Sequence, residues 1–324
     1  MRSILLRLMI LGISLAFAAD IGAQSYPTKP VRMVVGFPPG GATDLVARAI
    51  QPRMSAALGR QVVIDNRAGA NGIISGELVA HAEPDGYTIL FGHIGILVIS
   101  PAIQKVPYDV FKDFAPIGQA VSLQNLIITH PTMPAKTLKE LIALAKAKPG
   151  QINYASSGIG SPGHLAAVLL ESMAKITLTH IPYKGGGPAI TDLLAGQVPV
   201  FFSVISTGVP HVQAGKARGL AVTGTQRAKA IPDIPTVAEA GVPGYAATNW
   251  YGLLAPAKTP KPVIDRLNKE MVAALTAPEV AESLKSRGID ATPSSPAQFA
   301  AFIRAENAKW SQVIKQSGIK GEAP

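Results

Sequence analysis

Ser156-Ser-Gly-Ile-Gly-Ser-Pro-Gly-His164 is a glycine-rich stretch at the junction between an apolar, strand-like run and a helix-like run. The strand-like run covers Gln151 to Ala155, and the helix-like run covers His164 to Ala174. Free backbone N–H groups and the positive end of the helix dipole at such a junction favour an anion. The stretch also has the spacing G-x-G-x-x-G, so a dinucleotide is the first anion to consider.

The surroundings of this stretch argue against a dinucleotide. Pro162 removes one of the N–H donors that would face a pyrophosphate. The next strand-like run, Ile176 to Ile181, ends in His180-Ile-Pro-Tyr-Lys184 and offers no acidic residue for a ribose. We therefore expect a smaller anion at this junction.

A second junction of the same kind occurs near the N-terminus, in Gly36-Phe-Pro-Pro-Gly-Gly-Ala-Thr-Asp44. It joins the strand-like run Val31 to Gly36 to a helix that opens at Thr43-Asp44. Glycine allows a ligand oxygen to approach the backbone without meeting a Cβ atom. The loop lacks Lys-Ser/Thr after its glycines and is therefore not a P-loop. A purely structural interpretation also stands, in which Asp44 and Ser161 only cap their helices.

Strand-like and helix-like runs alternate along most of the chain, which predicts an α/β protein with largely parallel sheets. Helix signals include glycine after the last apolar position, a Thr-x-x-Glu capping box and Ser-Pro at a helix start. The expected strands are 31–36, 61–65, 87–91, 117–129, 151–155, 176–181, 198–202, 217–223 and 248–255. The expected helices are 43–58, 73–82, 137–148, 164–174, 188–195, one that ends before Gly215, 260–275, 278–287 and a last one from Ser295-Pro296.

The order of these elements predicts two α/β lobes with a ligand cleft between them, outside the carboxyl ends of the strands. The C-terminal quarter is nearly all helical and cannot build an α/β domain alone, so it should pack back on an earlier lobe. We expect the chain to cross between lobes near residues 125 and 248. Lobe 1 then comprises residues 24–124 and 249–324, and lobe 2 comprises residues 125–248.

The amino-acid composition excludes several classes of function. The 324 residues are 48% hydrophobic and 15% charged, which is typical of a globular, core-forming chain. The absence of cysteine excludes thiol catalysis, zinc fingers and disulfides. Lysine and arginine are scattered rather than clustered, aromatic residues are only 6%, and DNA-binding motifs are absent, so nucleic acid is not an expected partner.

The first residues have the layout of a secretory signal peptide. Arg2 and Arg7 precede an apolar run from Leu8 to Ala19, followed by small residues, and the run is too short to span a membrane comfortably. We expect residues 1–23 to be removed, with cleavage near Ala18 or Ala23. This takes one unit from the formal net charge of +10 and leaves +9. A basic surface favours anionic partners, although many exported proteins are basic without any such reason.

No catalytic or metal-binding pattern emerges. Ser161 and His164 are three residues apart at one helix start, which leaves an exported hydrolase as an alternative hypothesis. There is no G-x-S-x-G and no H-E-x-x-H motif, and the six histidines are dispersed. We therefore predict neither a metal nor a cofactor, and no enzymatic activity.

Several motifs together resemble the Bug family, the extracytoplasmic substrate-binding receptors of tripartite tricarboxylate transporters. The resemblance covers essentially residues 26 to 320. The motifs are Tyr26-Pro-Thr-Lys-Pro30, Phe37-Pro-Pro-Gly-Gly41 with Asp44, Val63-Ile-Asp-Asn-Arg-Ala-Gly-Ala-Asn-Gly72, Pro84-Asp-Gly-Tyr-Thr88, Tyr154 to Leu165, Pro182-Tyr-Lys-Gly185, Thr191-Asp-Leu-Leu-Ala-Gly196, Gly215-Lys-Ala-Arg-Gly-Leu-Ala-Val222, Pro235-Thr-Val-Ala-Glu-Ala-Gly241 and Trp250-Tyr-Gly252.

The resemblance implies a two-lobed periplasmic-binding-protein fold, a type II-like Venus flytrap, that closes on a small carboxylate held largely by backbone groups and waters. It implies no catalysis, a monomer, and integral-membrane transporter subunits as partners. Carried onto this chain, lobe 1 would contribute Phe37, Gly40, Gly41, Ala42, Thr43 and Asp44, with Asn71 and His93 nearby. Lobe 2 would contribute Ser156, Ser157, Gly160, Ser161 and His164, with Tyr183 at the rim.

One position departs from the family pattern. The family often has Asp after Val200-Phe-Phe202, where this chain has Ser203. A neutral serine offers no charge for an amine, which disfavours an amino-acid ligand, unless position 203 only shapes the pocket wall. We expect a periplasmic receptor for a small organic carboxylate. A ligand sensor that docks a membrane signalling protein would have the same pocket, and the sequence does not name the carboxylate.

Overall fold

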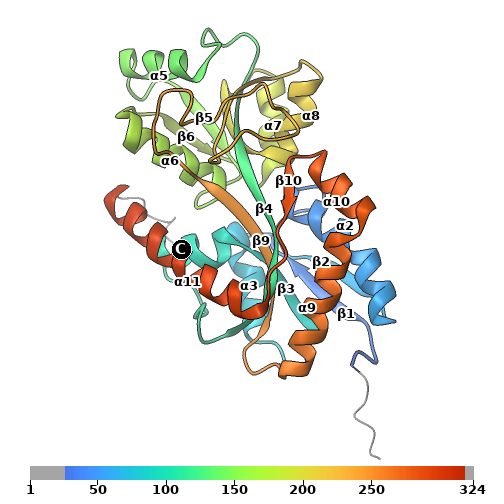
Figure 1. Ribbon diagram of the computed structural model, residues 1–324. Coiled ribbons are helices and arrows are strands. Elements are labelled where there is room, and N and C mark those ends of the chain that lie inside the picture. Colours follow the sequence, from blue (N-terminus) through green and yellow to red (C-terminus); the bar gives the residue numbers. More distant parts are fainter. Residues whose placement is uncertain (1–25, 318–324) are drawn as a thin grey trace, which may run out of the picture.

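The computed structural model describes residues 26–317. The expected signal peptide, residues 1–23, lies outside the described residues. Within residues 26–317, no helix is long and apolar enough to cross a membrane. The described chain forms two lobes joined by two long strands (Figure 1).

The first lobe is built on three parallel strands and the helices that follow them. β1 (Val31–Val35) lies between β2 (Val62–Asn66) and β3 (Thr88–His93) and pairs with both in parallel. α2 (Ala42–Leu58) follows β1 and ends at Gly59, which takes the left-handed conformation expected of a C-terminal glycine. η1 (Ala70–Gly72) and α3 (Ile73–Ala80) follow β2.

The segment after β3, for which the sequence predicted no regular element, is helical, and it is buried from Gly95 to Ser100. It forms the single-turn π-helix η2 (Gly95–Ile99) and then α4 (Ser100–Ile103). Gly-Ile-Leu-Val-Ile is apolar at every position, so it shows no amphipathic period. Tertiary burial therefore decides its conformation.

Two strands cross between the lobes. β4 (Phe114–Thr129) pairs antiparallel with β9 (Thr248–Pro256) from Phe114 to Gln124. From Asn125 to Thr129 it pairs instead with β7 (Val200–Val204), and from Leu126 also with β8 (Arg218–Val222). β9 returns to the first lobe and pairs antiparallel with β3. One strand path, β2-β1-β3-β9-β4-β7-β5-β6, therefore runs through both lobes.

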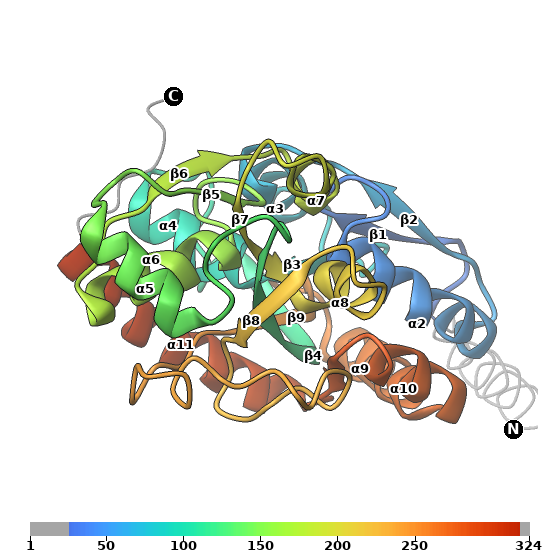
Figure 2. The same ribbon diagram turned by 90° about the horizontal axis from the view of Figure 1, so that it is seen from above.

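The second lobe repeats the strand–helix alternation. β5 (Asn153–Ser156) pairs in parallel with both β6 (Thr179–Pro182) and β7. Figure 2 shows α5 (Leu138–Ala147) and α6 (Pro162–Ala174) on one side of this sheet, and α7 (Gly186–Leu194) and α8 (Ile205–Gln213) on the other.

The α/β prediction is confirmed, but the expectation of largely parallel sheets is wrong. The four pairings of β1 with β2 and β3, and of β5 with β6 and β7, are parallel. The pairings of the two crossing strands and of β10 (Ile289–Ala291) are antiparallel. A strand that leaves one lobe and one that returns must run in opposite directions, and the alternation pattern does not reveal this.

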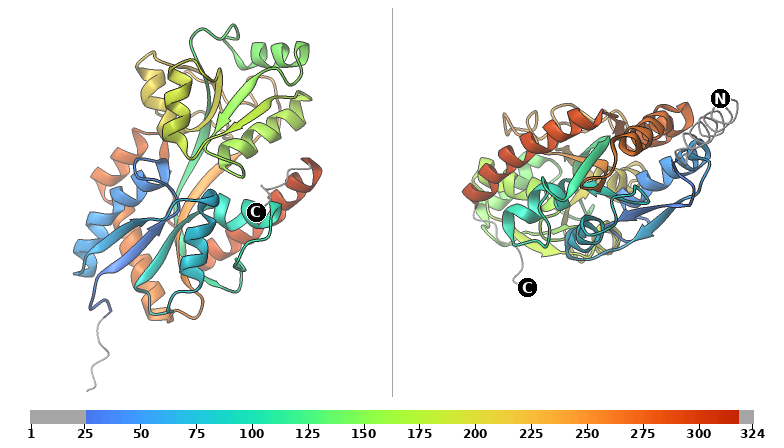
Figure 3. Two further views of the ribbon diagram at one scale, coloured as in Figure 1. Left: turned by 180° about the vertical axis from the view of Figure 1, so that it is seen from behind. Right: turned by 90° about the horizontal axis from the view of Figure 1, so that it is seen from below.

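The C-terminal helices pack back on the first lobe, as expected (Figure 3). α9 (Lys261–Thr276) packs on α2 and β4, α10 (Pro278–Lys285) packs on α2 and carries β10 beside β4, and α11 (Pro296–Ser317) packs on β4 and η2. The buried Glu306 of α11 accepts hydrogen bonds from the indole N–H groups of Trp250 and Trp310, at 3.0 and 3.1 Å. This ties the last helix to β9.

The hydrophobic core forms one layer on each face of the strand path. One cluster joins residues of α2 and α9 to residues of α7 and α8, for example Ile50, Leu267, Ile190 and Val209. The other joins the segment around η2 and α11 to α5 and α6. Because each layer extends through both lobes, the core helps to set how the lobes sit relative to each other.

Candidate functional site

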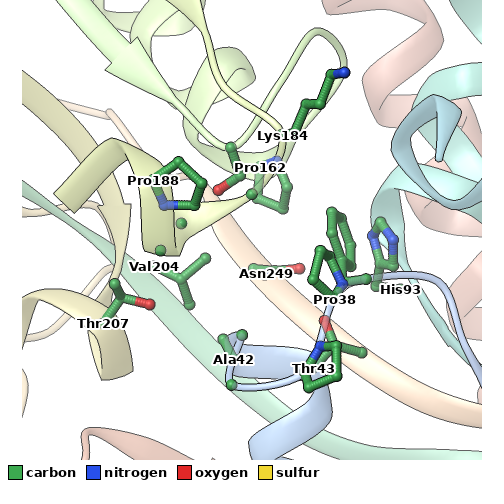
Figure 4. Close-up of a pocket in the computed structure, with 18 of the residues that line it drawn as sticks. Pro38, Ala42, Thr43, His93, Pro162, Lys184, Pro188, Val204, Thr207 and Asn249 are labelled. Atoms are coloured by element: carbon green, nitrogen blue, oxygen red, sulfur yellow. The ribbon is translucent and has the colours of Figure 1, made fainter. Parts of the chain in front are cut away.

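A cavity of about 260 Å³ lies between the lobes, where both lobes present the N-terminal ends of helices (Figure 4). Its walls come from β1–α2 and β3 of the first lobe, from the second lobe, and from the crossing strand β9. The lining residues are Phe37, Pro38, Pro39, Gly40, Gly41, Ala42, Thr43, His93, Ser157, Pro162, Lys184, Gly185, Gly186, Gly187, Pro188, Val204, Thr207, Asn249 and Tyr251.

The first wall is the loop between β1 and α2. α2 begins at Ala42, and its N-cap residue Gly41 has no side chain to occupy the first free N–H groups. Gly40 has φ +81°, a left-handed conformation that glycine adopts without strain. Backbone donors at this helix start therefore remain available on the cavity side.

Asp44 is not a cavity-lining residue and does not act as the N-cap of α2. It lies in the first turn, where its side chain is 3% exposed. Its carboxylate accepts hydrogen bonds from the Gly40 N–H at 2.9 Å, the Arg48 guanidinium at 2.8 Å and the Asn66 amide at 2.9 Å. Burial alone would raise the Asp44 pKa, but these hydrogen bonds outweigh it and lower the pKa. Asp44 thus fixes the shape of the first loop from behind.

The second wall is the start of α6, in the stretch that carries G-x-G-x-x-G. Ser161 is the N-cap of α6 and accepts the His164 N–H at 3.3 Å, so its expected capping role is confirmed. The side chain of Ser161 is fully buried and does not line the cavity. Ser157 and Pro162 are the members of this stretch at the cavity wall.

Two further helix starts, which were not predicted to belong to the site, also reach the cavity. α7 begins at Gly186 after the N-cap Gly185, and α8 begins at Ile205 after the N-cap Val204, neither with a capping side chain. Lys184-Gly-Gly-Gly-Pro188 carries the same signal, glycines at a helix start, that identified the first two loops. α8 carries no such signal, because its start is apolar.

The cavity's inner wall comes from β3 and β9. His93 is fully buried, and its Nδ1 accepts the Gly95 N–H at 2.9 Å. Burial lowers the pKa of His93 to about 3, so the ring is neutral and carries its proton on Nε2. That Nε2 has no hydrogen-bond partner among the described residues. It is therefore a donor that the protein itself leaves unused.

Tyr251 and Asn249 project from the same strand into this wall. Burial raises the pKa of Tyr251 to about 12, so its phenol remains protonated, with hydrogen bonds to Thr43 and Asn249. Asn249 Oδ1 accepts the Trp250 N–H at 2.8 Å, which fixes the orientation of its amide. Neither residue was predicted, although Trp250-Tyr-Gly252 was among the motifs of the resemblance.

The charge of the cavity wall comes from one basic side chain. Lys184 is exposed, and Figure 4 shows its ammonium directed away from the other labelled residues. No aspartate or glutamate lines the cavity. Residues 26–317 also contain no group of three or more His, Asp or Glu residues arranged to hold a metal ion.

Ser156, Gly160 and His164 lie behind the second wall. Ser156 Oγ makes a 2.7 Å hydrogen bond with His180 Nε2 and also contacts Gly158. His164 Nδ1 accepts the Gly160 N–H at 3.1 Å. Since His164 uses this nitrogen for the backbone, and Ser161 Oγ bonds the His164 main chain rather than its ring, no nucleophile–base pair forms here.

The remaining predicted residues lie outside the cavity wall. Asn71 Nδ2 donates to the Gly160 carbonyl at 2.7 Å. Tyr183 donates to the Asp192 carboxylate at 2.8 Å. The buried Ser203 donates to the carbonyl of Val204 at 2.9 Å. Ser203 therefore supports the wall residue Val204.

Two lobes that enclose a cavity ringed by helix N-termini define a solute-binding protein. The chain matches the model of the tripartite tricarboxylate transporter family receptor over residues 46–319, and it belongs to this family. The resemblance to Bug receptors is thereby confirmed. The family consists of receptors, and the chain is accordingly not an enzyme.

Relatives of known sequence match along nearly their whole length. The UPF0065 protein in the tcbD-tcbE intergenic region of Pseudomonas sp. strain P51 is 38% identical over 95% of this chain and 93% of its own length. BugT of Bordetella pertussis is 34% identical over 97% of this chain and 98% of its own length.

Solved structures of similar proteins share the fold. Rpa4515 of R. palustris, determined with adipate, is 35% identical with a TM-score of 0.88, over 91% of this chain and 99% of that chain. The periplasmic binding protein BugD is 36% identical with a TM-score of 0.86, over 92% of this chain and 100% of that chain. MatC of Rhodopseudomonas palustris, with bound malate, is 33% identical with a TM-score of 0.85, over 89% of this chain and 100% of that chain.

Proposed function

We propose that this protein captures a small organic carboxylate in the cavity between its lobes and delivers it to a membrane transporter. The observation that carries the proposal is the convergence of four helix N-termini, those of α2, α6, α7 and α8, on one cavity without an acidic side chain. Three of these helices lack a capping side chain, so their free N–H groups and dipoles favour an anion. The adipate and malate of Rpa4515 and MatC are ligands of this chemistry.

We propose His93 as the side-chain donor to a ligand oxygen. Its Nε2–H lies in a fully buried ring at the cavity wall and has no hydrogen-bond partner among the described residues. A hydrogen bond to a charged group contributes about 1.5–3 kcal/mol, which corresponds to roughly 10- to 100-fold in affinity. The backbone N–H groups of Ala42, Thr43 and Ser157, with the hydroxyl of Thr207, complete the proposed contacts.

Binding is proposed to proceed by lobe closure. Each lobe supplies part of the anion site, so the closed state binds the ligand better than the open state and is selected by it. β4 changes partners between Gln124 and Asn125, and β9 begins at Thr248. These positions support hinge points near residues 125 and 248, with lobe 1 at 24–124 and 249–324 and lobe 2 at 125–248.

The protein is first purified without denaturant, and mass spectrometry identifies any ligand that co-purifies with it. After this ligand has been removed, calorimetry measures the binding of adipate and malate. We expect at least one organic acid to bind, and the neutral dimethyl ester of adipate not to bind. His93→Phe should lose affinity, whereas His93→Gln, which places an amide donor near the former Nε2, should retain more of it. Binding of no organic acid, or equal binding of acid and ester, would refute the proposal.

The location and the partner need separate experiments. We propose export to the periplasm with cleavage near Ala18 or Ala23, which N-terminal sequencing of the exported protein tests. Delivery is tested by uptake into vesicles that contain the transporter's membrane subunits. Ligand binding without stimulated uptake would favour the alternative role as a sensor for a membrane signalling protein.

A further inference from the structure

The side chain of Asn71 crosses from one lobe to the other. Asn71 lies in η1 of the first lobe, and its Nδ2 donates to the carbonyl of Gly160, just before α6 of the second lobe, at 2.7 Å. Within residues 26–317, the other side-chain hydrogen bonds between lobes are those of Gln124 to Gly224 and Gln226, beside the crossing strand β4. No ion pair joins the two lobes in that range.

The backbone around Asn71 is held in an unusual conformation. Ala70 and Asn71 have φ +45° and +51°, and they lie between Gly69 and Gly72, whose φ values are also positive. Two successive non-glycine residues in the left-handed region are strained, although asparagine tolerates it better than most residues. Strain of this kind persists where the surrounding structure enforces it, and it marks candidate functional positions.

Gly160, whose carbonyl accepts the hydrogen bond from Asn71, is equally constrained. Gly160 has φ +71°, and a Cβ atom there would lie 3.1 Å from Ile103 Cδ1 and 3.2 Å from Asn71 Nδ2. Its own N–H is bound to His164 Nδ1 at 3.1 Å. Gly160 is therefore held by its own lobe through its N–H and contacted by the opposite lobe at its carbonyl.

Asn71 does not line the cavity. Its amide contacts the back of the loop whose Ser157 does line it. A bond whose donor and acceptor belong to different lobes must break when the lobes separate. It therefore stabilises the closed state alone.

We propose that Asn71 is a positioning residue that latches the closed lobes through Gly160, without touching the ligand. The inference rests on the proposed function, because it assumes that ligand binding requires closure. A latch raises the fraction of molecules in the closed state, and the apparent dissociation constant scales inversely with that fraction. It also slows reopening and hence ligand release.

Asn71→Gly removes the amide at a position where glycine is favoured, so the variant should fold normally. Loss of one neutral hydrogen bond predicts an apparent Kd for adipate and malate raised roughly 2- to 10-fold, mostly through faster dissociation. Because the latch does not contact the ligand, the factor should be the same for both acids. Asn71→Asp keeps the size of the side chain but loses the donor, and it should weaken binding as well.

Ala70→Gly is the matched control, since it relaxes the neighbouring left-handed residue without removing the amide. It should leave affinity and dissociation rate unchanged. An Asn71→Gly variant with wild-type Kd and dissociation rate would overturn the latch. So would factors that differ between adipate and malate, because these would indicate direct ligand contact.

A measurement of the distance between the lobes distinguishes a failure of the latch from a failure of the proposed function. The chain has no cysteine, so spin labels can be attached to cysteines introduced at the exposed positions Val63 in lobe 1 and Met173 in lobe 2. Without ligand, the Asn71→Gly protein should populate the short, closed distance less than the protein with Asn71. Equal distributions would refute the latch, whereas failure of the wild type to bind any organic acid would refute the proposed function.

Discussion

The imidazole rings of His164 and His180 stack with their centroids 4.1 Å apart and their planes 8° from parallel. Together they hold the glycine-rich stretch at its start and at its middle, because His180 Nε2 bonds Ser156 Oγ and His164 Nδ1 accepts the Gly160 N–H. Tyr154 stacks on the other side of His180 at 4.9 Å. Three stacked rings thus support the loop that forms the second wall of the cavity.

His164→Leu should weaken ligand binding, because the Gly160 N–H loses its acceptor and the loop loses its support. His164→Asn should retain more of the affinity, since the asparagine Oδ1 can occupy the position of Nδ1. We expect the leucine variant to lose about 1–3 kcal/mol of unfolding free energy as well. Calorimetry and urea unfolding measure both effects, and equal affinities of the two variants would contradict a role for the Nδ1 acceptor.

Acid should destabilise the protein well above the pH at which its buried histidines titrate. Burial lowers the pKa of His164 to about 4 and of His93 to about 3, whereas the unfolded chain protonates both near the ordinary value of about 6.5. Between these values only the unfolded state gains protons. The stabilisation is therefore complete above about pH 6.5 and is lost as the pH falls toward about 4 for His164 and about 3 for His93, by up to about 1.4 kcal/mol per pH unit for each histidine.

Urea unfolding between about pH 7.5 and about pH 4.5 measures this dependence. The double variant His93→Gln, His164→Asn should show a shallower slope than the wild type. His81→Gln, at an exposed histidine, is the control for replacing a histidine as such. A wild-type slope in the double variant would show that these two rings do not cause the acid sensitivity.

Asp44→Asn should destabilise the first loop, because it removes the charge that binds Arg48 and an acceptor for the Gly40 N–H. Hydrogen bonds to charged groups contribute about 1.5–3 kcal/mol each, so we expect a loss of about 1–3 kcal/mol in unfolding free energy, with weaker ligand binding. Asp85→Asn removes an exposed pairing with Lys29 and should cost less than about 0.5 kcal/mol. Equal effects of the two substitutions, measured by urea unfolding, would argue against this role of Asp44.

Gly163→Ala should be destabilising by about 1–3 kcal/mol, because the new Cβ would lie 2.1 Å from the carbonyl oxygen of Phe202. The start of α6 would have to move away from β7, and ligand binding should weaken with it. Gly187→Ala adds the same methyl group where nothing lies within 4 Å and should leave the melting temperature nearly unchanged. Thermal unfolding compares the two, and similar melting temperatures would contradict the packing argument.

Lys184→Gln should lower affinity about 2-fold at about 0.01 M salt and have almost no effect at about 1 M salt, because an exposed charge acts on the ligand only through a screened field. Lys139→Gln, on α5, provides the control and should have no effect at either salt concentration. Calorimetry at both ionic strengths measures the difference. A loss that persists at high salt would mean that the Lys184 ammonium bonds the ligand directly.

Local sequence patterns predicted much of the framework. Gly59 at the end of α2, Thr137 with Glu140 at the start of α5, and Ser161 before α6 all occupy their expected places, because caps depend on a few neighbouring residues. Ser295 likewise accepts the Gln298 N–H where the last helix begins. The predicted residues that lie at the cavity wall are Phe37, Gly40, Gly41, Ala42, Thr43, His93 and Ser157, whereas the other predicted site residues lie outside it.

Short-range periodicity and the backbone freedom of glycine specify the alternation of strands and helices and the two glycine-rich helix starts, so these features are predictable from local sequence. Long-range packing brings Asn249 and Tyr251 to the cavity, places the starts of α7 and α8 there, and brings Asn71 to Gly160. These contacts join residues up to about two hundred positions apart. They depend on how β4 and β9 carry the chain between lobes, and no local pattern encodes that geometry.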